Sequence, residues 1–333
     1  MLKGRSQPMV SVVMASFNHE RFVVEAVKSV LAQSLDNLEL IVVDDASNDQ
    51  TPDLVASIAD KRLRLVRLPI NRGIQVRNLG LGLARGRYIA FQNSDDVWHV
   101  DKLAKQVEVM EANLDMTACF TGVALIDEYG GPKKNTWADN LFTLENRSPK
   151  AWLRHFFDFG NCLALPSALV RRTDLVELGG FCGSLVQLSD IDLWVRLAGF
   201  GNFLILQDQL THLRIVDGLN LSAPSKRVSR RYHIELMTVL ERFTAPKLLE
   251  RYPFIFPDLV DSGKPGARKV ALALRALQRH GSAGLMFADR VITNVLDDEI
   301  ARADALESHG PAFIHEFFER RCNMEIIISE AMN

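Results

Sequence analysis

The chain contains few cysteines and no apolar run long enough to cross a membrane. Its four cysteines are scattered and form no C-x-x-C pair: Cys119, Cys162, Cys182 and Cys322. Zinc sites and disulfide frameworks need closely spaced or paired cysteines, so we expect neither and predict free thiols in a reducing cytosol. The first apolar stretch, VSVVMA, ends at Ser16, which is too short for a signal peptide or a membrane span. A cytoplasmic protein is therefore predicted.

The sequence also lacks an excess of charge of either sign. Among 333 residues, 39 lysines and arginines nearly cancel 41 aspartates and glutamates, which leaves a formal charge of −2. This balance does not favour a nucleic-acid polymer as partner, because such binding depends on many cations that neutralise phosphates. Apolar residues make up 47% of the chain and charged residues 24%, values that are typical of a folded globular protein.

Two glycine-rich phosphate-binding motifs are absent as well. No G-x-G-x-x-G follows the first apolar run, and no G-x-x-x-x-G-K-[ST] occurs anywhere in the chain. These motifs hold the phosphates of dinucleotides and of nucleoside triphosphates through backbone N–H groups. Their absence weighs against a nicotinamide-dependent oxidoreductase and against a P-loop phosphotransferase.

What the sequence does contain is an alternation of short apolar runs with longer amphipathic segments. Strands are predicted at residues 10–15, 38–43, 63–68, 88–92, 117–126 and 162–170. Helices are predicted at residues 20–33, 51–60, 75–85, 100–113, 145–157 and 190–198. The first strands are almost continuously apolar, as LELIVV is, which suits a sheet covered by helices on both faces. The pattern predicts an α/β fold with a Rossmann-type, mostly parallel sheet flanked by helices.

The segments that follow the first, second and fourth predicted strands are rich in polar residues. They are Ser16-Phe17-Asn18, Asp44-Asp45 and Asn93-Ser94-Asp95-Asp96. Ligands of parallel sheets bind beyond the carboxyl ends of the strands. Helix capping explains Asp49 alone, which precedes Thr51-Pro52, but it does not explain two acidic pairs. A carboxylate pair on a loop, in a chain without cysteine or histidine clusters, indicates Mg²⁺ or Mn²⁺, cations that are commonly shared with a diphosphate.

On these residues the sequence resembles a known family. The segments SFNHERF, LELIVVDDASNDQT, NRGIQVRNLG and NSDDVWH occur in the order that is typical of the family 2 inverting glycosyltransferases of the GT-A fold. The resemblance extends over about residues 9–222. It implies transfer of a sugar from a nucleoside-diphosphate sugar, with a UDP-sugar favoured, to a hydroxyl group of a saccharide or lipid-linked acceptor. The expected setting is the synthesis of a cell-surface polysaccharide or glycolipid.

The resemblance also implies roles for individual residues. Asp96 corresponds to the direct metal ligand, with Asp95 beside it. The residues that correspond to the donor-nucleotide site are Ala15, Ser16, Phe17, Asn18, Asp45, Arg77, Asn93, Asp95 and Arg214. Many family members have Asp-x-Asp-Asp where this chain has Asn93 as the first residue, and a histidine where it has Val216. An amide contributes no charge to a metal site, and a third protein ligand is not evident; His212 is interpreted as structural.

Asp190 corresponds to the family's general base, at the start of a predicted helix. An inverting transfer needs a carboxylate that takes a proton from the attacking acceptor hydroxyl, on the face of the sugar opposite the nucleotide. The residue before it is Ser189, where a glutamate is commoner in the family. The alternative interpretation is that Asp190 only caps the helix. Asp192 is the weaker candidate, because two residues along a helix it faces elsewhere.

The sequence divides into a catalytic domain at residues 1–222 and a helical region at residues 223–333. We expect the helical region to contact the acceptor, a second subunit or the inner face of a membrane. Residues 267–280 predict a basic amphipathic helix, which is either solvated or able to lie on anionic lipid. The apolar segment 324–329 can dock on the body of the protein or on a second copy in a homo-oligomer.

Two other functions stay open at this point. A sugar-phosphate nucleotidyltransferase would use a similar sheet and metal, but it needs a glycine- and basic-rich loop after the first strand, where this chain has Ser16 to Glu20. A degenerate, non-catalytic module that binds a nucleotide or a sugar is suggested by Asn93, Ser189 and Val216. The missing loop distinguishes this chain from a nucleotidyltransferase. A measurement of donor turnover distinguishes a glycosyltransferase from the non-catalytic module.

Overall fold

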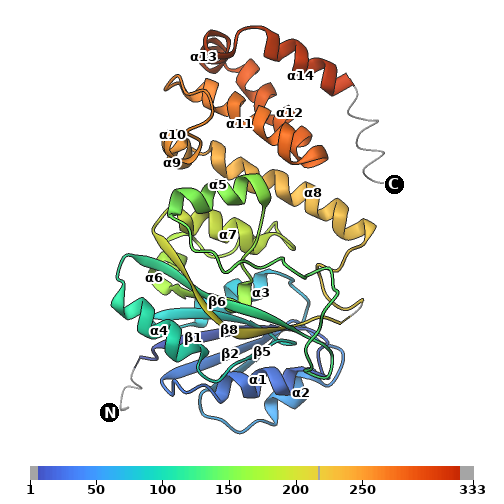
Figure 1. Ribbon diagram of the computed structural model, residues 1–333. Coiled ribbons are helices and arrows are strands. Elements are labelled where there is room, and N and C mark those ends of the chain that lie inside the picture. Colours follow the sequence, from blue (N-terminus) through green and yellow to red (C-terminus); the bar gives the residue numbers. More distant parts are fainter. Residues whose placement is uncertain (1–6, 217, 323–333) are drawn as a thin grey trace. The chain divides into compact units, whose positions relative to one another are not determined.

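The computed structural model describes residues 7–216 and 218–322, which fold into two compact units (Figure 1). Within the described residues, the first unit comprises the chain up to Ser148 together with Cys162–Asn220, and the second comprises Pro149–Asn161 and the chain from Leu221 onward. The boundary after Asn220 lies close to the predicted one at residue 222. Residues 149–161 nevertheless belong to the second unit, so residues 1–222 do not form one compact body. The roles assigned to the two domains stay predictions.

A sheet of eight strands, counted within the described residues, forms the centre of the first unit (Figure 1). Its order is β3-β2-β1-β4-β7-β6-β8-β5. The strands are β1 (Val10–Ser16), β2 (Leu38–Asp44), β3 (Leu63–Arg67), β4 (Tyr88–Asn93), β5 (Val97–Trp98), β6 (Met116–Ile126), β7 (Leu169–Arg171) and β8 (Asn202–Arg214). The pairs β1·β2, β1·β4, β2·β3 and β6·β8 are parallel, whereas β7 is antiparallel to both of its neighbours and β5 is antiparallel to β8. The mostly parallel sheet that the sequence predicts is confirmed.

Helices of this unit bury one apolar face each. They are α1 (Val23–Leu31), α2 (Thr51–Ala56), α3 (Gln75–Leu83), α4 (Lys102–Ala112), α6 (Arg172–Glu177) and α7 (Ser189–Ala198). In α1 the buried residues Val23, Ala26, Val27 and Val30 recur at three- and four-residue spacing, as an amphipathic helix requires. In α3 a Cβ at Gly80 would lie 2.4 Å from Val13 Cγ1, so the missing side chain lets the helix lie directly on β1.

Four elements of the first unit differ from the sequence prediction, among them helix α6, which has no predicted counterpart. The expected strand at residues 162–170 is wrong: Leu165–Ser167 forms a short 3₁₀ turn with Pro166 in its first positions, and only Leu169–Arg171 is extended. Strand β5 and the first half of β8 have no counterpart in the prediction. Both depend on partners far away in the chain, since β8 pairs with β6 from Met116 to Ile126 and β5 pairs with β8.

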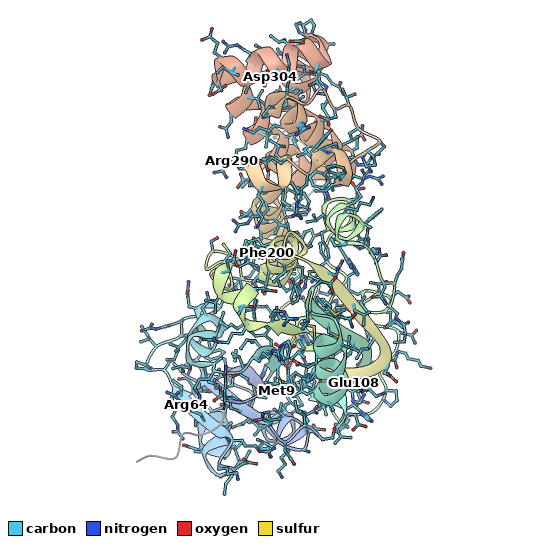
Figure 2. All side chains as sticks on the ribbon, turned by 90° about the vertical axis from the view of Figure 1, so that its left-hand side faces the viewer. Met9, Arg64, Glu108, Phe200, Arg290 and Asp304 are labelled. Atoms are coloured by element: carbon cyan, nitrogen blue, oxygen red, sulfur yellow. The ribbon has the colours of Figure 1, made fainter. Side chains whose placement is uncertain are left out.

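The second unit is helical over its described residues. It contains α5 (Pro149–Phe159), α8 (Lys226–Glu241), α9 (Pro246–Leu249), α10 (Tyr252–Ile255), α11 (Pro265–Arg279), α12 (Gly281–Asp297), α13 (Glu299–His309) and α14 (Ala312–Cys322), with a 3₁₀ turn at Arg242–Thr244. In this unit the ion pair between Arg290 of α12, labelled in Figure 2, and Glu241 of α8 spans 3.0 Å. Figure 2 also shows the first unit's side chains, among them Met9, which precedes β1, and the exposed Arg64 of β3.

Helix α11 is the basic helix that the sequence predicts at residues 267–280, but it does not present its apolar face to a surface. It packs against α12 and α13 and buries Val270, Leu272 and Ala276. Its cations form ion pairs inside the unit: Arg268 with Asp261 at 2.7 Å and Arg275 with Asp158 at 2.8 Å. The apolar face of this helix is therefore occupied by packing within the unit, which favours the interpretation as a helix that is solvated on its polar face; contact of the helical region with a membrane stays a prediction.

No helix in the part of the chain that the structure describes is both long and apolar enough to span a bilayer. The apolar segment 324–329, for which docking was predicted, lies outside the described residues.

Candidate functional site

The ends of β1, β2 and β4 bring the predicted nucleotide-site residues together. In the register of the sheet, Ala15 lies beside Val43 on one side and beside Asn93 on the other, and Ser16 lies beside Asp44. These pairs are neighbours because all three strands run parallel and end at the same edge. The polar segments that follow the three strands are therefore adjacent, as the sequence predicts.

Hydrogen bonds join the loop after β1 to the loop after β2. The N–H of Asn18 donates to Ser47 Oγ at 3.0 Å, and the N–H of Asn48 donates to Asn18 Oδ1 at 2.8 Å. Asn18 and Ala46 adopt φ of +52° and +61°, a region that non-glycine residues seldom occupy. Such conformations are held only where the surroundings determine them, and they concentrate at ligand sites. Next to Asn18, the ring of Phe17 is 43% exposed and is open to a ligand.

The two acids after β2 have different surroundings. Asp44 accepts from Ser16 Oγ at 2.9 Å and from Ser47 Oγ at 2.6 Å, so its carboxylate holds the two loops. Asp45 accepts from the N–H groups of Arg72 at 2.6 Å and Gly73 at 2.8 Å, which fixes the segment that precedes α3. A carboxylate has about four lone-pair positions, so Asp45 keeps acceptor capacity for a nucleobase N–H.

The acidic loop after β4 places two carboxylates where burial opposes their charge. Asp96 is 3% exposed and accepts from Asn93 Nδ2 and from the N–H of Arg214, both at 2.8 Å. Burial raises the pKa of Asp96 well above its ordinary value, and the neighbouring Asp95 raises it further. Burial also raises the pKa of Asp95, although His19 and Arg214 oppose this shift electrostatically. A bound cation would stabilise both charges at once, so these residues fit a hard divalent metal.

The protein offers such a cation few further ligands. Within residues 7–216 and 218–322, no three side chains of His, Cys, Asp or Glu gather as a metal site. His212 lies on β8 opposite Val97, and burial and the nearby His99 lower its pKa. It takes part in no such group, so the structure does not support His212 as a third ligand. Asp95 and Asp96 would hold the cation together with oxygens of a bound diphosphate or of water.

Arg214 ends β8 and is 1% exposed. Its Nε donates to the carbonyl of Asp95 and its Nη1 to the carbonyl of Asp127, both at 2.8 Å, while Nη2 pairs with Glu25 Oε2 at 2.6 Å. The guanidinium also lies 4.9 Å from the centre of the Phe22 ring. The guanidinium of Arg214 thus binds the acidic loop and its neighbours. This geometry favours a positioning role over the diphosphate contact that the family resemblance implies.

The candidate base lies in the first turn of α7. The N–H of Ile191 donates to Asp190 Oδ1 at 2.8 Å. Asp192 is fully buried and pairs with Arg196 at 2.7 Å, which gives it a structural role and leaves Asp190 as the stronger candidate. On α3, burial lowers the pKa of Arg77 and Asp190 opposes that shift, so the two charges lie within electrostatic reach. The structure thus brings Arg77, predicted on the nucleotide side, close to the candidate base.

Sequence reasoning missed three polar residues of this region. His19 Nδ1 lies 2.8 Å from Ser94 Oγ, Glu25 pairs with Arg214, and Asn78 binds the main chain of Phe181. Only Asn78 had a sequence signal, because it directly follows Arg77 in a family motif. Trp98 and Trp194 are buried, and Trp194 packs edge-on against Phe120, so both tryptophans contribute to packing.

Comparison with known sequences finds a family model that matches part of the chain. The family model described as Glycosyl transferase family 2 matches residues 11–171. The chain is 42% identical over 129 residues to the putative teichuronic acid biosynthesis glycosyltransferase TuaG of Bacillus subtilis, a match that covers 38% of this chain and 51% of TuaG. It is 38% identical over 104 residues to WfaP of Escherichia coli, over 31% of this chain and 41% of WfaP. The chain spans about half the length, or less, of these relatives.

WfaP is named a UDP-Glc:alpha-D-GlcNAc-diphosphoundecaprenol beta-1,3-glucosyltransferase. Among solved structures, the mannosyltransferase PcManGT of Pyrobaculum calidifontis, in complex with GDP-Man and Mn²⁺, matches with a TM-score of 0.55 at 19% identity. The match covers 98% of this chain and 86% of that chain. At this identity the likeness concerns the fold. The fold class and the family that the sequence predicts are both confirmed.

Proposed function

We propose, from the membership of residues 11–171 in glycosyl transferase family 2, that the protein is a metal-dependent inverting glycosyltransferase. It moves a sugar from a nucleoside-diphosphate sugar to a hydroxyl group of an acceptor. The observation that carries this proposal is the meeting of three loops at one edge of the sheet, two of which bear Asp45, Asp95 and Asp96. Arg77 of α3 in turn lies within electrostatic reach of Asp190.

The donor nucleotide lies at the ends of β1 and β2. The exposed ring of Phe17 packs on the base, and Asp45 accepts a hydrogen bond from a base N–H. Uracil carries one ring N–H that suits a single carboxylate, and the relative WfaP is named for its use of UDP-Glc. A UDP-sugar is therefore the favoured donor. Asn93, which ends β4, and Asp95, which follows the strand, contact the ribose.

Asp96, with Asp95 beside it, holds Mn²⁺ or Mg²⁺. When bound, the cation stabilises the charge that develops on the departing diphosphate. Support comes from the burial of Asp96, from the raised pKa values of both carboxyls, and from the Mn²⁺ in the complex of the similarly folded PcManGT. The hydrogen bonds from Asn93 and from the main chain of Arg214 orient the Asp96 carboxylate.

Asp190 accepts the proton of the acceptor hydroxyl as that oxygen attacks the anomeric carbon from the side opposite the diphosphate. The Arg77 guanidinium nearby favours the ionised carboxylate, which is the form that a base requires. Asp192 cannot take over this role, since it is fully buried against Arg196.

The acceptor is a saccharide, free or attached to a lipid, in the synthesis of a cell-surface polysaccharide or glycolipid. TuaG is named for teichuronic acid biosynthesis, and the acceptor in the name of WfaP is linked to undecaprenol. A lipid-linked acceptor would place the protein at the cytoplasmic face of a membrane as a peripheral protein. The helices of the second unit are the part left for contact with such a membrane, with the acceptor or with a second copy.

A thermal-shift panel followed by a transfer assay tests the proposal. Nucleoside diphosphates and nucleotide sugars are added with and without Mn²⁺, and a ligand of the native state raises the melting temperature. We expect UDP with Mn²⁺ to give the largest shift. Asp190→Asn should then lower kcat for transfer by roughly 10²–10⁴-fold at an unchanged donor affinity.

The matched control is Asp53→Asn, which removes an exposed carboxylate from the first turn of α2 and should leave transfer unchanged. If the wild-type protein binds a nucleoside diphosphate with Mn²⁺ but turns over no donor, the protein is the non-catalytic module instead. Formation of a nucleotide sugar from a sugar phosphate and a nucleoside triphosphate would identify the nucleotidyltransferase.

A further inference from the structure

Asn78 of α3 binds the main chain of Phe181 through both polar atoms of its side chain. Its Nδ2 donates to the carbonyl of Phe181 at 2.8 Å, and the N–H of Phe181 donates to its Oδ1 at 2.8 Å. The two residues are 103 positions apart in the chain. Because two short hydrogen bonds join one amide to one residue, both the distance and the orientation of the two segments are fixed.

The segment around Phe181 is shaped for this contact. Gly180 adopts a φ of +73°, and a Cβ there would lie 2.5 Å from Asn78 Oδ1. A Cβ at Gly183 would lie 2.2 Å from the side-chain Nε2 of Gln75, one turn earlier on α3. The missing side chain at Gly180 therefore leaves room for the Asn78 amide, whereas the flexible end of Gln75 could move away from a Cβ at position 183.

The same segment is bound from the other side by α7. Arg196 donates to the carbonyls of Leu178 at 3.1 Å and Gly180 at 2.8 Å, and it also pairs with Asp192. Residues 178–181 therefore lie between Asn78 of α3 and Arg196 of α7. Since α7 carries Asp190 in its first turn, this segment connects the candidate base to α3.

Helix α3 is in turn connected to the nucleotide site. Asp45 binds the N–H groups of Arg72 and Gly73, which lie just before the helix begins at Gln75. Arg77, the neighbour of Asn78, has its guanidinium 5.8 Å from the centre of the Phe181 ring. A continuous set of contacts thus runs from the donor-binding Asp45 through α3 and Phe181 to the helix that bears Asp190.

We infer that Asn78 is a positioning residue for sugar transfer, which sets the helix of the base Asp190 relative to the bound donor. This inference rests on the proposed function. Both polar atoms of the Asn78 side chain bind Phe181, so Asn78 acts through the main chain of that residue. Its loss should therefore impair the attack of the acceptor, which needs the base in place, and spare the binding of the donor nucleotide.

The test is Asn78→Leu, which keeps the size of the side chain and removes both hydrogen bonds. Asn146→Leu is the matched control, because Asn146 binds the main chain of Ile205 in the same way, at 3.0 and 2.7 Å, near the start of β8 rather than at the site. We expect Asn78→Leu to lower kcat for transfer by about 10- to 100-fold with the Kd for UDP and Mn²⁺ nearly unchanged. Asn146→Leu should lose comparable thermal stability and keep its kcat.

A second readout separates positioning from a general loss of structure. With the base displaced, hydrolysis of the donor by water should rise relative to transfer, and the acidic limb of the pH profile of kcat should move. Asn78→Asp, which retains the bond from the N–H of Phe181 and loses the bond to its carbonyl, should give an intermediate kcat and serves if the leucine variant does not fold.

Equal kcat values for the wild type and for folded Asn78→Leu or Asn78→Asp would overturn the inference. A loss of kcat in Asn146→Leu as large as in Asn78→Leu would overturn it as well, since the effect would then be structural. If the wild-type protein turns over no donor, the proposed function itself is contradicted. Failure of the proposed function is thus distinguishable from failure of the role inferred for Asn78.

Discussion

The main-chain N–H of Arg214 donates to Asp96 Oδ1 at 2.8 Å and so joins the end of β8 to the acidic loop after β4, 118 residues earlier. The side chain of Arg214 reinforces the link through the carbonyl of Asp95 and through Glu25 of α1. The position of the Asp96 carboxylate, which we propose as a metal ligand, thus depends on a strand that lies outside the part of the chain matched by the family model.

Replacing Arg214 by Gln should destabilise the fold more than it weakens a direct donor contact. The change removes an ion pair and two hydrogen bonds from a buried site, so we expect the free energy of unfolding to fall by roughly 2–3 kcal/mol. Denaturant unfolding measures the loss, and Arg21→Gln, in an exposed pair with Glu128, should change it by less than about 0.5 kcal/mol. Unchanged stability together with a raised donor KM would instead assign Arg214 to the diphosphate.

Asn93→Asp should strengthen metal binding and lower the thermal stability of the metal-free protein. In the native chain the Asn93 amide donates to Asp96 Oδ2, and a carboxylate at this position would add repulsion beside two acids whose pKa values burial already raises. We expect a lower melting temperature without metal and a larger Mn²⁺-induced rise, measured by differential scanning fluorimetry. A metal-induced rise no larger than that of the wild type would show that residue 93 does not face the cation.

Phe17→Ala should weaken donor binding without affecting the fold. The ring is 43% exposed at the end of β1, and stacking of a base on an aromatic ring contributes about 1–3 kcal/mol, or roughly 5- to 150-fold in Kd. Isothermal titration with UDP and Mn²⁺ measures the change. Tyr129→Ala, which removes another exposed ring, should leave the Kd as it is. Equal Kd values for the two variants would exclude stacking on Phe17.

Lys102→Met should remove a pH dependence of stability. Lys102 is fully buried, with Nζ 2.8 Å from Gln106 Oε1 and 4.0 Å from the centre of the Trp98 ring, and burial lowers its pKa to about 7. Above pH 7 the unfolded chain still binds a proton that the folded chain has lost, so stability should rise with pH by up to about 1.4 kcal/mol per unit.

The measurement for Lys102 is denaturant unfolding between pH 7 and 8.5. Above this range Cys119 acts in the opposite direction, because burial raises the pKa of its thiol to about 12. The methionine variant should be more stable than the wild type at pH 7 and should lose the slope. Lys105→Met, at an exposed pair with Asp208, should keep it; a wild-type stability that does not rise over this range would contradict the prediction.

Much of the first unit could be predicted from the sequence because its signals are local. The run from Val10 becomes β1 and the run from Leu38 becomes β2, since continuous apolar residues of this length suit strands buried on both faces. Adjacent strands then bring Ser16, Asp45 and Asn93 to one edge whatever the loops between them do. Asp190 is predicted as the base in a different way, by the family resemblance rather than by a local apolar pattern.

Other features depended on long-range contacts that no local pattern carries. Strand β5 forms because Val97 and Trp98 pair with His212 and Thr211 of β8. The pairing of Asn78 with Phe181 and the assignment of residues 149–161 to the second unit have the same character. Helix α11 shows the reverse case, since its amphipathic pattern is correct but its apolar face meets other helices rather than a surface.

The sequence by itself determined most of the strands and helices around β1, β2 and β4 and the identity of the acids that follow them, because apolar periodicity and motif spacing are properties of neighbouring residues. Only the tertiary structure decided what each acid does. Asp44 and Asp45 are adjacent in the chain, yet one holds two serines and the other holds the main chain before α3. Hydrogen-bond partners and burial set these roles, and both arise only when distant segments meet.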